Sequence, residues 1–93
     1  MEYNEALKTV WKLANGYGGA AQVCTGVILG LYNGSTYPFD LTDLKLLDKN
    51  NQSVVLNFIA GSLQSRREIH LDIKDYIGSS EWDSFIKKNG KHK

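Results

Sequence analysis

The chain of 93 residues contains only one cysteine, Cys24, and only one proline, Pro38. A single cysteine excludes an intramolecular disulfide, and the first residues do not resemble a secretory signal. Long hydrophobic runs are missing as well. The most apolar run, Val27 to Tyr32, is far shorter than the about 20 residues that a membrane-spanning helix needs. We therefore expect a cytoplasmic protein that does not enter a membrane.

Charge is scarce in one part of the chain. Between Leu13 and Phe39 there is no Asp, Glu, Lys or Arg, and six of the nine glycines lie in this span. This composition predicts either a central helix that the other helices surround or a helix that is partly an interface. The formal net charge of +1 gives no overall field that attracts nucleic acid or a membrane.

The length and the ordinary apolar fraction predict one compact domain, residues 1–93, with a frayed basic tail over residues 90–93. Apolar residues recur with the 3.6-residue period of helices over most of the chain. This period predicts an all-α fold of five to six short helices, with the second helix at the centre. The expected helices cover residues 3–15, 19–32, 41–47, 49–63, 65–77 and 80–90.

An alternative α+β fold, with a hairpin at about residues 53–73, stays open. Its first half is rich in residues that suit a strand, and residues 69–73 alternate between apolar and polar. We favour helices because Asp48 and Ser65 stand where helix N-caps belong. Ile77 also extends the helical spacing and not the alternating one.

The stretch Tyr32–Asp48 predicts a helix end, a rigid corner and a new helix start. Asn33-Gly34 is typical of a left-handed helix end, and Pro38 excludes a continuous helix. Asp40 is placed to cap the next helix. Phe39 is expected to close the core together with three leucines at helical spacing, Leu41, Leu44 and Leu47.

Two further local patterns concern helix packing and helix starts. Gly26 and Gly30 lie four residues apart, so they leave a smooth strip on which we expect the helix over residues 3–15 or 49–63 to pack. Ser80, with Asp83 three residues later, predicts the start of the last helix.

The stretch YNGSTYPFDLTDLKLLD, followed by Arg67-Glu68-Ile69-His70, resembles a family of small uncharacterised bacterial domains. Members are mainly proteobacterial and are often encoded on plasmids or integrated elements. The resemblance covers roughly residues 14–88. It implies a helical fold and a mobile-element context, and it implies neither an activity nor catalytic residues.

His70 is the nearest approach to a chemical site, because it stands between Glu68 and Asp72. On a helix these carboxylates point to different sides and do not converge with His70, whereas on a strand all three share one face. Cys24 has no basic neighbour in the sequence and is expected to be a buried, unreactive thiol. We expect no cofactor, no metal site and no enzyme.

We expect a non-catalytic protein-interaction module that acts by surface occlusion or by self-association. The candidate partner contacts are Tyr17, Leu29 and Tyr32. The resemblance adds the expectation of a mobile-element accessory protein or a modulator of a host system. The alternative is a small nucleic-acid-binding regulator, which is disfavoured because acidic residues lie between its basic clusters. Its candidate contacts are Arg66, Arg67, Lys87 and Lys88.

Overall fold

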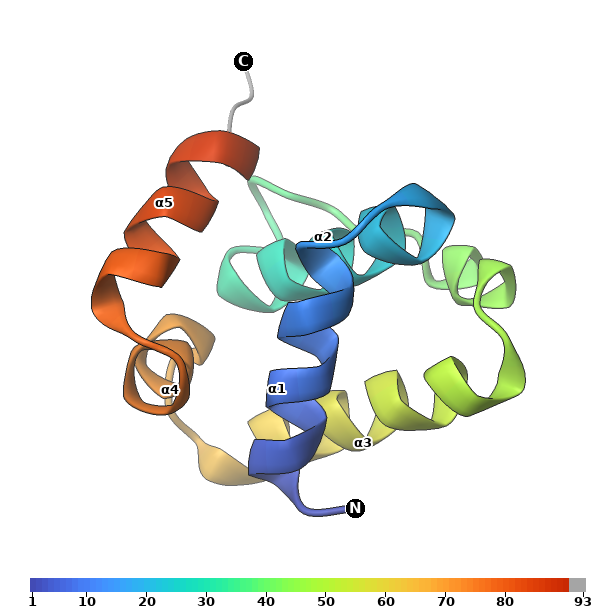
Figure 1. Cartoon of the computed structure of the whole chain (residues 1–93), viewed down its shortest axis with the longest axis horizontal. Helices are drawn as coiled ribbons and strands as arrows, with labels where there is room; N and C mark the ends of the chain where they lie inside the picture. The colour runs from blue at the N-terminus through green and yellow to red at the C-terminus, as the bar shows by residue number, and fades with distance from the viewer. Residues whose placement is uncertain (91–93) are drawn as a thin grey trace.

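The computed structural model describes residues 1–90 and is entirely helical apart from short connections (Figure 1). No strand is present within these residues, so the all-α expectation is confirmed and the hairpin at 53–73 is wrong. Of the expected frayed tail over residues 90–93, residues 91–93 lie outside the described residues. The helices are α1 (Tyr3–Ala14), α2 (Gly18–Tyr32), the 3₁₀ helix η1 (Leu41–Leu46), α3 (Lys49–Ser65), α4 (Ile69–Tyr76) and α5 (Ser79–Asn89).

Helix α1 organises the packing. Its inner face buries four residues, Ala6, Leu7, Val10 and Ala14. The two most extensive helix contacts join α1 to α2 and to α3, and α1 also reaches α4. Helix α2 buries more residues than α1, six against four, so the expectation of a central second helix holds for burial, whereas α1 makes the most extensive helix contacts. An amphipathic helix with small residues on its inner face lets both uncharged helices approach it closely.

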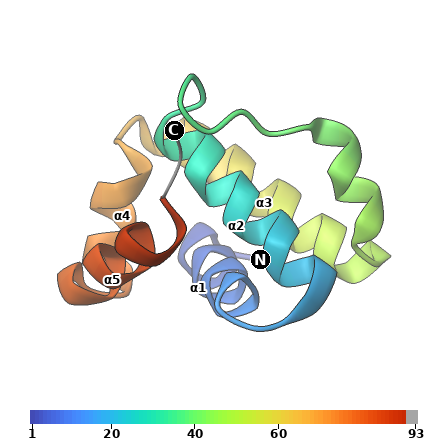
Figure 2. The same ribbon diagram turned by 90° about the horizontal axis from the view of Figure 1, so that it is seen from above.

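Helices α2 and α3 both run from the η1 side of the molecule toward the α4 side (Figures 1 and 2). Each packs on α1, which crosses them. Helix α2 is the more deeply covered of the two. Its buried residues are Ala21, Val23, Cys24, Val27, Ile28 and Leu29.

The strip of Gly26 and Gly30 on α2 is covered by Phe39 and not by another helix. A Cβ atom built on Gly26 would lie 2.9 Å from Cδ1 of Phe39, and one on Gly30 would lie 3.2 Å from Cβ of Phe39. The expected packing of a neighbouring helix on this strip is therefore wrong. The glycines let the connection after α2 fold back onto the helix, with Phe39 as its anchor.

The corner between α2 and η1 agrees only in part with the prediction from the sequence. Asp40 caps η1, because its Oδ1 accepts a hydrogen bond from the backbone N–H of Thr42 at 2.9 Å. Asn33, however, is extended, with φ −158°, so the left-handed cap is wrong. Of the expected leucine stripe, Leu47 is buried and Leu44 half-buried, but Leu41 is 70% exposed. The short, tighter 3₁₀ helix changes the angles at which these side chains project.

The helix starts in the second half were predicted with mixed success. Asp48 caps α3 through the backbone N–H of Asn51 at 2.8 Å, as expected. Ser65 is instead the last residue of α3, and α4 begins after Glu68. Ser80 lies inside α5, which begins after Gly78 at φ 150°. Both serine caps are wrong, because chain reversals at Arg66 and Gly78 set these helix starts.

Candidate functional site

The exposed leucines mark where the structure leaves apolar surface uncovered. On α3, Leu56 is 56% exposed and Leu63 is 67% exposed, although the opposite side of the same helix is buried in the core. On η1, Leu41 and Leu46 are 70% and 69% exposed. Apolar surface gathered in one place is the usual mark of a contact site.

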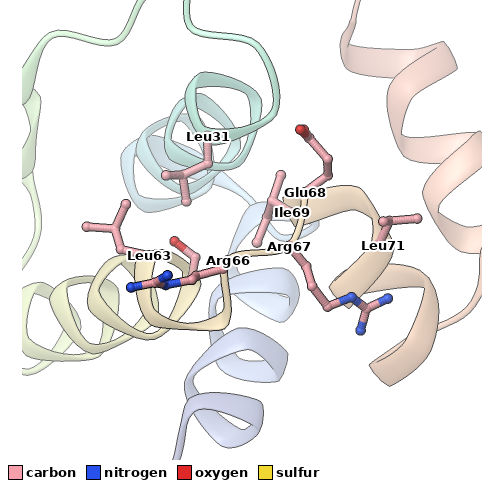
Figure 3. Close-up of a pocket in the computed structure, with 8 residues that line it drawn as sticks. Leu31, Leu63, Arg66, Arg67, Glu68, Ile69 and Leu71 are labelled. Atoms are coloured by element: carbon pink, nitrogen blue, oxygen red, sulfur yellow. The ribbon is translucent and has the colours of Figure 1, made fainter.

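Two open pockets lie on this side of the molecule, and both are lined by Leu31 of α2. The first has a volume of about 510 Å³, and in it Leu31 faces Leu63 of α3 (Figure 3). Its other lining residues come from the end of α3 and the start of α4. These are Ser62, Arg66, Arg67, Glu68, Ile69 and Leu71.

The second pocket, of about 430 Å³, is lined almost entirely by apolar groups. Besides Leu31 it is formed by Val27, Gly30, Gly34, Pro38, Phe39, Leu41 and Ile59. The two pockets share Leu31 and therefore adjoin at its side chain, and we treat them together as one groove bordered by α2, η1, α3 and the start of α4. We call it the Leu31 groove and define it by the residues that line these two pockets.

The charged rim of the groove lies at the α3–α4 connection. Arg66 has the left-handed conformation with φ 59°, which ends α3 and brings its guanidinium beside Leu63 (Figure 3). No carboxylate lies within ion-pair distance of Arg66 among residues 1–90. Glu68, the N-cap residue of α4, lines the same pocket. The groove is thus apolar at the second pocket, and its three charged lining residues, Arg66, Arg67 and Glu68, lie at the α3–α4 end.

Arg67 lines the first pocket, but its guanidinium is turned away from Leu31, because two aspartates of α4 bind it (Figure 3). Its Nη1 lies 3.1 Å from Oδ1 of Asp72 and 2.7 Å from Oδ2 of Asp75. The hydrogen bond that Arg67 donates to Asp75, together with the nearby negative charges, raises the pKa of the Arg67 guanidinium. Arg67 therefore holds the α3–α4 connection against α4. It is less available than Arg66 to bind an external anion.

Asp72 is 2% exposed and ties three helices together behind this rim. The hydroxyl of Tyr3 donates to its Oδ2 at 2.7 Å, and the hydroxyl of Ser65 donates to the same atom at 2.9 Å. A buried carboxylate needs such partners to offset its lost hydration. Burial, followed by the hydrogen bond to Asp72, raises the pKa of Tyr3 above its ordinary value. This cluster fixes α1, the end of α3 and α4 relative to one another.

The structure separates the three candidate partner contacts. Tyr17 is 98% exposed, just before α2, whereas Leu29 is 7% exposed and belongs to the core. The expectation that Leu29 offers surface to a partner is therefore wrong for the folded chain. Tyr32 is half-buried, with its ring centroid 5.4 Å from that of His70 and 5.1 Å from that of Trp82. None of the three lines the Leu31 groove.

The basic residues of the nucleic-acid alternative do not form one surface. Arg66 and Arg67 lie at the α3–α4 connection, and Lys87 and Lys88 lie in the last turn of α5, at the opposite end of the molecule (Figure 1). Lys88 lines other pockets, beside α1 and the start of α2. A phosphate backbone would meet these two clusters on separate sides.

The remaining sequence candidates also lie in separate surroundings. His70 packs against aromatic rings while Asp72 binds Tyr3 and Ser65, so the two side chains do not converge. No group of three or more His, Cys, Asp or Glu side chains that could hold a metal occurs within residues 1–90. Cys24 is buried, and this burial raises the pKa of its thiol to about 11. No helix of this part of the chain is long and apolar enough to cross a membrane.

Sequence reasoning missed the groove residues Leu31, Leu41 and Leu63, but a signal for α3 was present. From Asn50 to Ser65 the chain carries no charged residue, although this helix has an exposed side. Solvent-facing helix positions are usually charged, and the cores of interfaces are depleted of charge. The same absence between Leu13 and Phe39 directed attention to α2 instead.

The curated proteins and the solved structures provide no match to this chain. A family model does match, over residues 4–90, which is nearly the whole of the described fold and extends beyond the region of the expected resemblance at both ends. The match supports neither a bacterial origin nor a mobile-element context. The chain belongs to DUF7673, a family of unknown function.

Proposed function

We propose that this protein is a non-catalytic protein-interaction module whose contact surface is the Leu31 groove. It acts by occluding the surface of a partner protein or by self-association. The observation that carries the proposal is the pair of pockets that meet at Leu31, flanked by Leu41 and Leu63, which are 70% and 67% exposed. Apolar grooves of this kind bind side chains of a partner's helix or loop.

The chemistry around the groove supports the binding of a partner protein. Its walls are mostly leucine, isoleucine, valine and phenylalanine, and its charged groups, Arg66, Arg67 and Glu68, are confined to the α3–α4 end. Apolar walls supply binding free energy, and rim charges supply orientation. On the resemblance alone, we further propose an accessory role on a mobile element, or modulation of a host system.

Co-purification from the native host tests the proposal. Leu63→Glu and Leu41→Glu place a charge in the groove, and the expected result is loss of the partner that wild-type protein retains, or loss of self-association. Leu46→Glu is the matched control, because Leu46 is 69% exposed on η1 but lines neither pocket. Equal recovery of the same partner, or equal self-association, for all four proteins would contradict the groove as the contact surface.

The nucleic-acid alternative stays a prediction, with less support from the arrangement of charge. Binding through Arg66, Arg67, Lys87 and Lys88 would weaken steeply with salt concentration. A titration with duplex DNA at two salt concentrations measures this directly. Tight, salt-dependent binding that is lost in Arg66→Ala would favour this alternative over the proposed module.

A further inference from the structure

Three asparagines of this chain are followed directly by glycine, in Asn15-Gly16, Asn33-Gly34 and Asn89-Gly90. Asparagine is thermolabile, and it reacts most readily before glycine, whose backbone nitrogen is not shielded by a side chain. That nitrogen loses its proton and attacks the carbon of the asparagine amide, so that a C–N bond forms and the amide nitrogen leaves as ammonia. Water then breaks one of the two C–N bonds of the resulting cyclic imide, which yields aspartate or isoaspartate. The sequence makes the three pairs equivalent, so the fold decides which of them reacts.

The pair at the end of α1 is held by two hydrogen bonds. The N–H of Gly16 donates to the backbone oxygen of Leu13 at 3.0 Å. Nδ2 of Asn15 donates to the backbone oxygen of Trp11 at 2.8 Å. The first bond protects the proton that must be lost, as in slow amide hydrogen exchange, and the second holds the amide against the last turn of the helix. Both reacting groups are therefore engaged.

The pair at the end of α5 repeats this arrangement. The N–H of Gly90 donates to the backbone oxygen of Ile86 at 2.8 Å, and Nδ2 of Asn89 donates to that of Phe85 at 3.1 Å. Asn89 and Gly90 are also half-buried, whereas Asn33 and Gly34 are exposed. We therefore expect the folded protein to protect this pair as it protects the pair at α1.

The pair after α2 has the opposite arrangement. The N–H of Gly34 donates to no group within residues 1–90, and Nδ2 of Asn33 has no acceptor in this part of the chain. Oδ1 of Asn33 instead accepts a hydrogen bond from the backbone N–H of Thr36 at 3.2 Å. A donor at this oxygen stabilises the negative charge that forms on it when the amide carbon is attacked. The nucleophile is thus accessible and the amide is activated.

One backbone hydrogen bond opposes the reaction at Asn33. Its backbone is extended, with φ −158° and ψ 90°, so it must rotate about ψ before the nitrogen of Gly34 reaches the amide carbon. This rotation breaks the hydrogen bond from the N–H of Tyr37 to the backbone oxygen of Asn33, at 2.8 Å. Residues 33–35 are exposed, so the rotation takes place in a surface turn.

We propose that Asn33 is a site of spontaneous deamidation, to which the fold directs a reaction that the sequence offers at three places. The product lies at the Leu31 groove, because Gly34 lines the second pocket. Conversion places a negative charge beside this apolar pocket and at the C-terminal end of α2, where the helix dipole disfavours it. Isoaspartate also adds a methylene group to the backbone that brings Phe39 onto the glycine strip of α2.

Mass spectrometry of peptides from the full chain tests the reaction. The protein is incubated in mildly alkaline buffer, and each pair is followed by the mass gained when the amide NH₂ becomes OH. In folded protein we expect Asn33 to convert at least tenfold faster than Asn15 or Asn89. In concentrated guanidinium chloride, which removes the helix-end hydrogen bonds, we expect the three rates to agree within a few-fold. Asn33→Gln is the matched control, because glutamine must close a larger ring and converts far more slowly.

The rates in the folded protein decide the proposal. Equal rates at the three pairs overturn it, and so does faster conversion at Asn15 or Asn89. Failure of Asn33 to convert in folded protein, while it converts in unfolded protein, overturns it as well.

The effect on the groove rests on the proposed function and is tested separately. Asn33→Asp carries the new charge from the start, and we expect it to recover several-fold less of the partner than wild type in co-purification from the native host. Asn15→Asp is the matched control, because it places the same charge at the end of α1, outside the groove. Equal recovery by Asn33→Asp would contradict the effect on the groove and leave the deamidation site standing. If no partner or self-association responds to Leu63→Glu or Leu41→Glu, the proposed function fails, whereas the conversion measured by mass does not depend on it.

Discussion

The chain contains two long helices that are almost free of charge, and they have different surroundings. Helix α2 lies within the uncharged span Leu13–Phe39, and α3 is uncharged from Asn50 to Ser65. Helix α2 is covered by α1, by α4 and by Phe39 on its glycine strip. Helix α3 packs on α1 with one side and exposes leucines on the other. The absence of charge therefore marks burial in one helix and, as we propose, an interface in the other.

The difference follows from what the connections do. After α2 the chain turns back and lays Phe39 over Gly26 and Gly30. After α3 it turns away at Arg66 into α4, and nothing within residues 1–90 returns to cover Leu56. An uncharged helix in a small domain is hidden only if a later segment covers its outer side. The following predictions test this contrast, beginning with the largest expected effect.

The same leucine-to-glutamate substitution should change stability very differently in the two helices. Leu29→Glu places an unpaired carboxylate in the core, and we expect it to lower the free energy of unfolding by at least about 3 kcal/mol. Leu63→Glu places it in solvent, and we expect a change within about 0.5 kcal/mol. Urea unfolding at high dilution, which disfavours any self-association, measures both. Comparable losses for the two variants would mean that α3 is as buried as α2.

Removing the cover of α2 should also be costly. We expect Phe39→Ala to lower the free energy of unfolding by about 3 kcal/mol, the low end of the range for buried phenylalanine, because the ring is half-buried. Gly26→Ala provides the matched test. In the wild-type background its Cβ would meet the ring at 2.9 Å, whereas in Phe39→Ala it should recover up to about 1 kcal/mol of helix propensity. A destabilising Gly26→Ala in both backgrounds would exclude Phe39 as the covering group.

The packing of the inner side of α3 should depend on Tyr3. This residue packs on Gly61, and its hydroxyl donates a hydrogen bond to Asp72. We expect Tyr3→Phe to cost about 1.5 kcal/mol, typical of a hydrogen bond to a charged group. Tyr76→Phe, an exposed neighbour at 42%, should change stability little. Urea unfolding at neutral pH compares the two variants. Equal effects would mean that the hydrogen bond from Tyr3 to Asp72 does not contribute to stability.

The same hydroxyl gives a pH dependence. Folding raises the pKa of Tyr3 above the ordinary value of 10.0, chiefly through burial, so the folded state retains the proton more strongly than the unfolded state. Its contribution to stability is complete below pH 10 and is lost as the pH rises above it. Stability measured between pH 9 and about 11 should therefore fall less steeply in Tyr3→Phe than in wild type. Parallel curves would contradict this role.

The smallest effect concerns thiol reactivity and not stability. The pKa of Cys24 is raised to about 11 by burial in α2, so at neutral pH it should react slowly with a disulfide reagent. A thiol introduced at Ala60 on the exposed side of α3 should react far faster in the same protein, when measured at high dilution. Similar rates for the two thiols would contradict the contrast in exposure.

Much of the fold was readable from local sequence. The helical period outweighed the alternating pattern at residues 53–73, and Asp40 and Asp48 cap their helices as expected. These features depend on neighbours within a few residues, so the chain itself specifies them. Ser65 and Ser80 failed as caps because the chain reversals at Arg66 and Gly78 place the helix starts at Glu68 and Gly78, neither of which caps its helix through a side chain.

The sequence by itself determined that this is an all-helical domain with two uncharged helices. Only the tertiary structure decided that α2 is covered, that Leu29 is in the core, and that Leu31, Leu41 and Leu63 border a groove. The physical reason is that helix periodicity identifies an apolar side without identifying what packs on it. That depends on the path of residues 33–40 and on the turn at Arg66, where long-range packing selects one arrangement among several that local preferences allow.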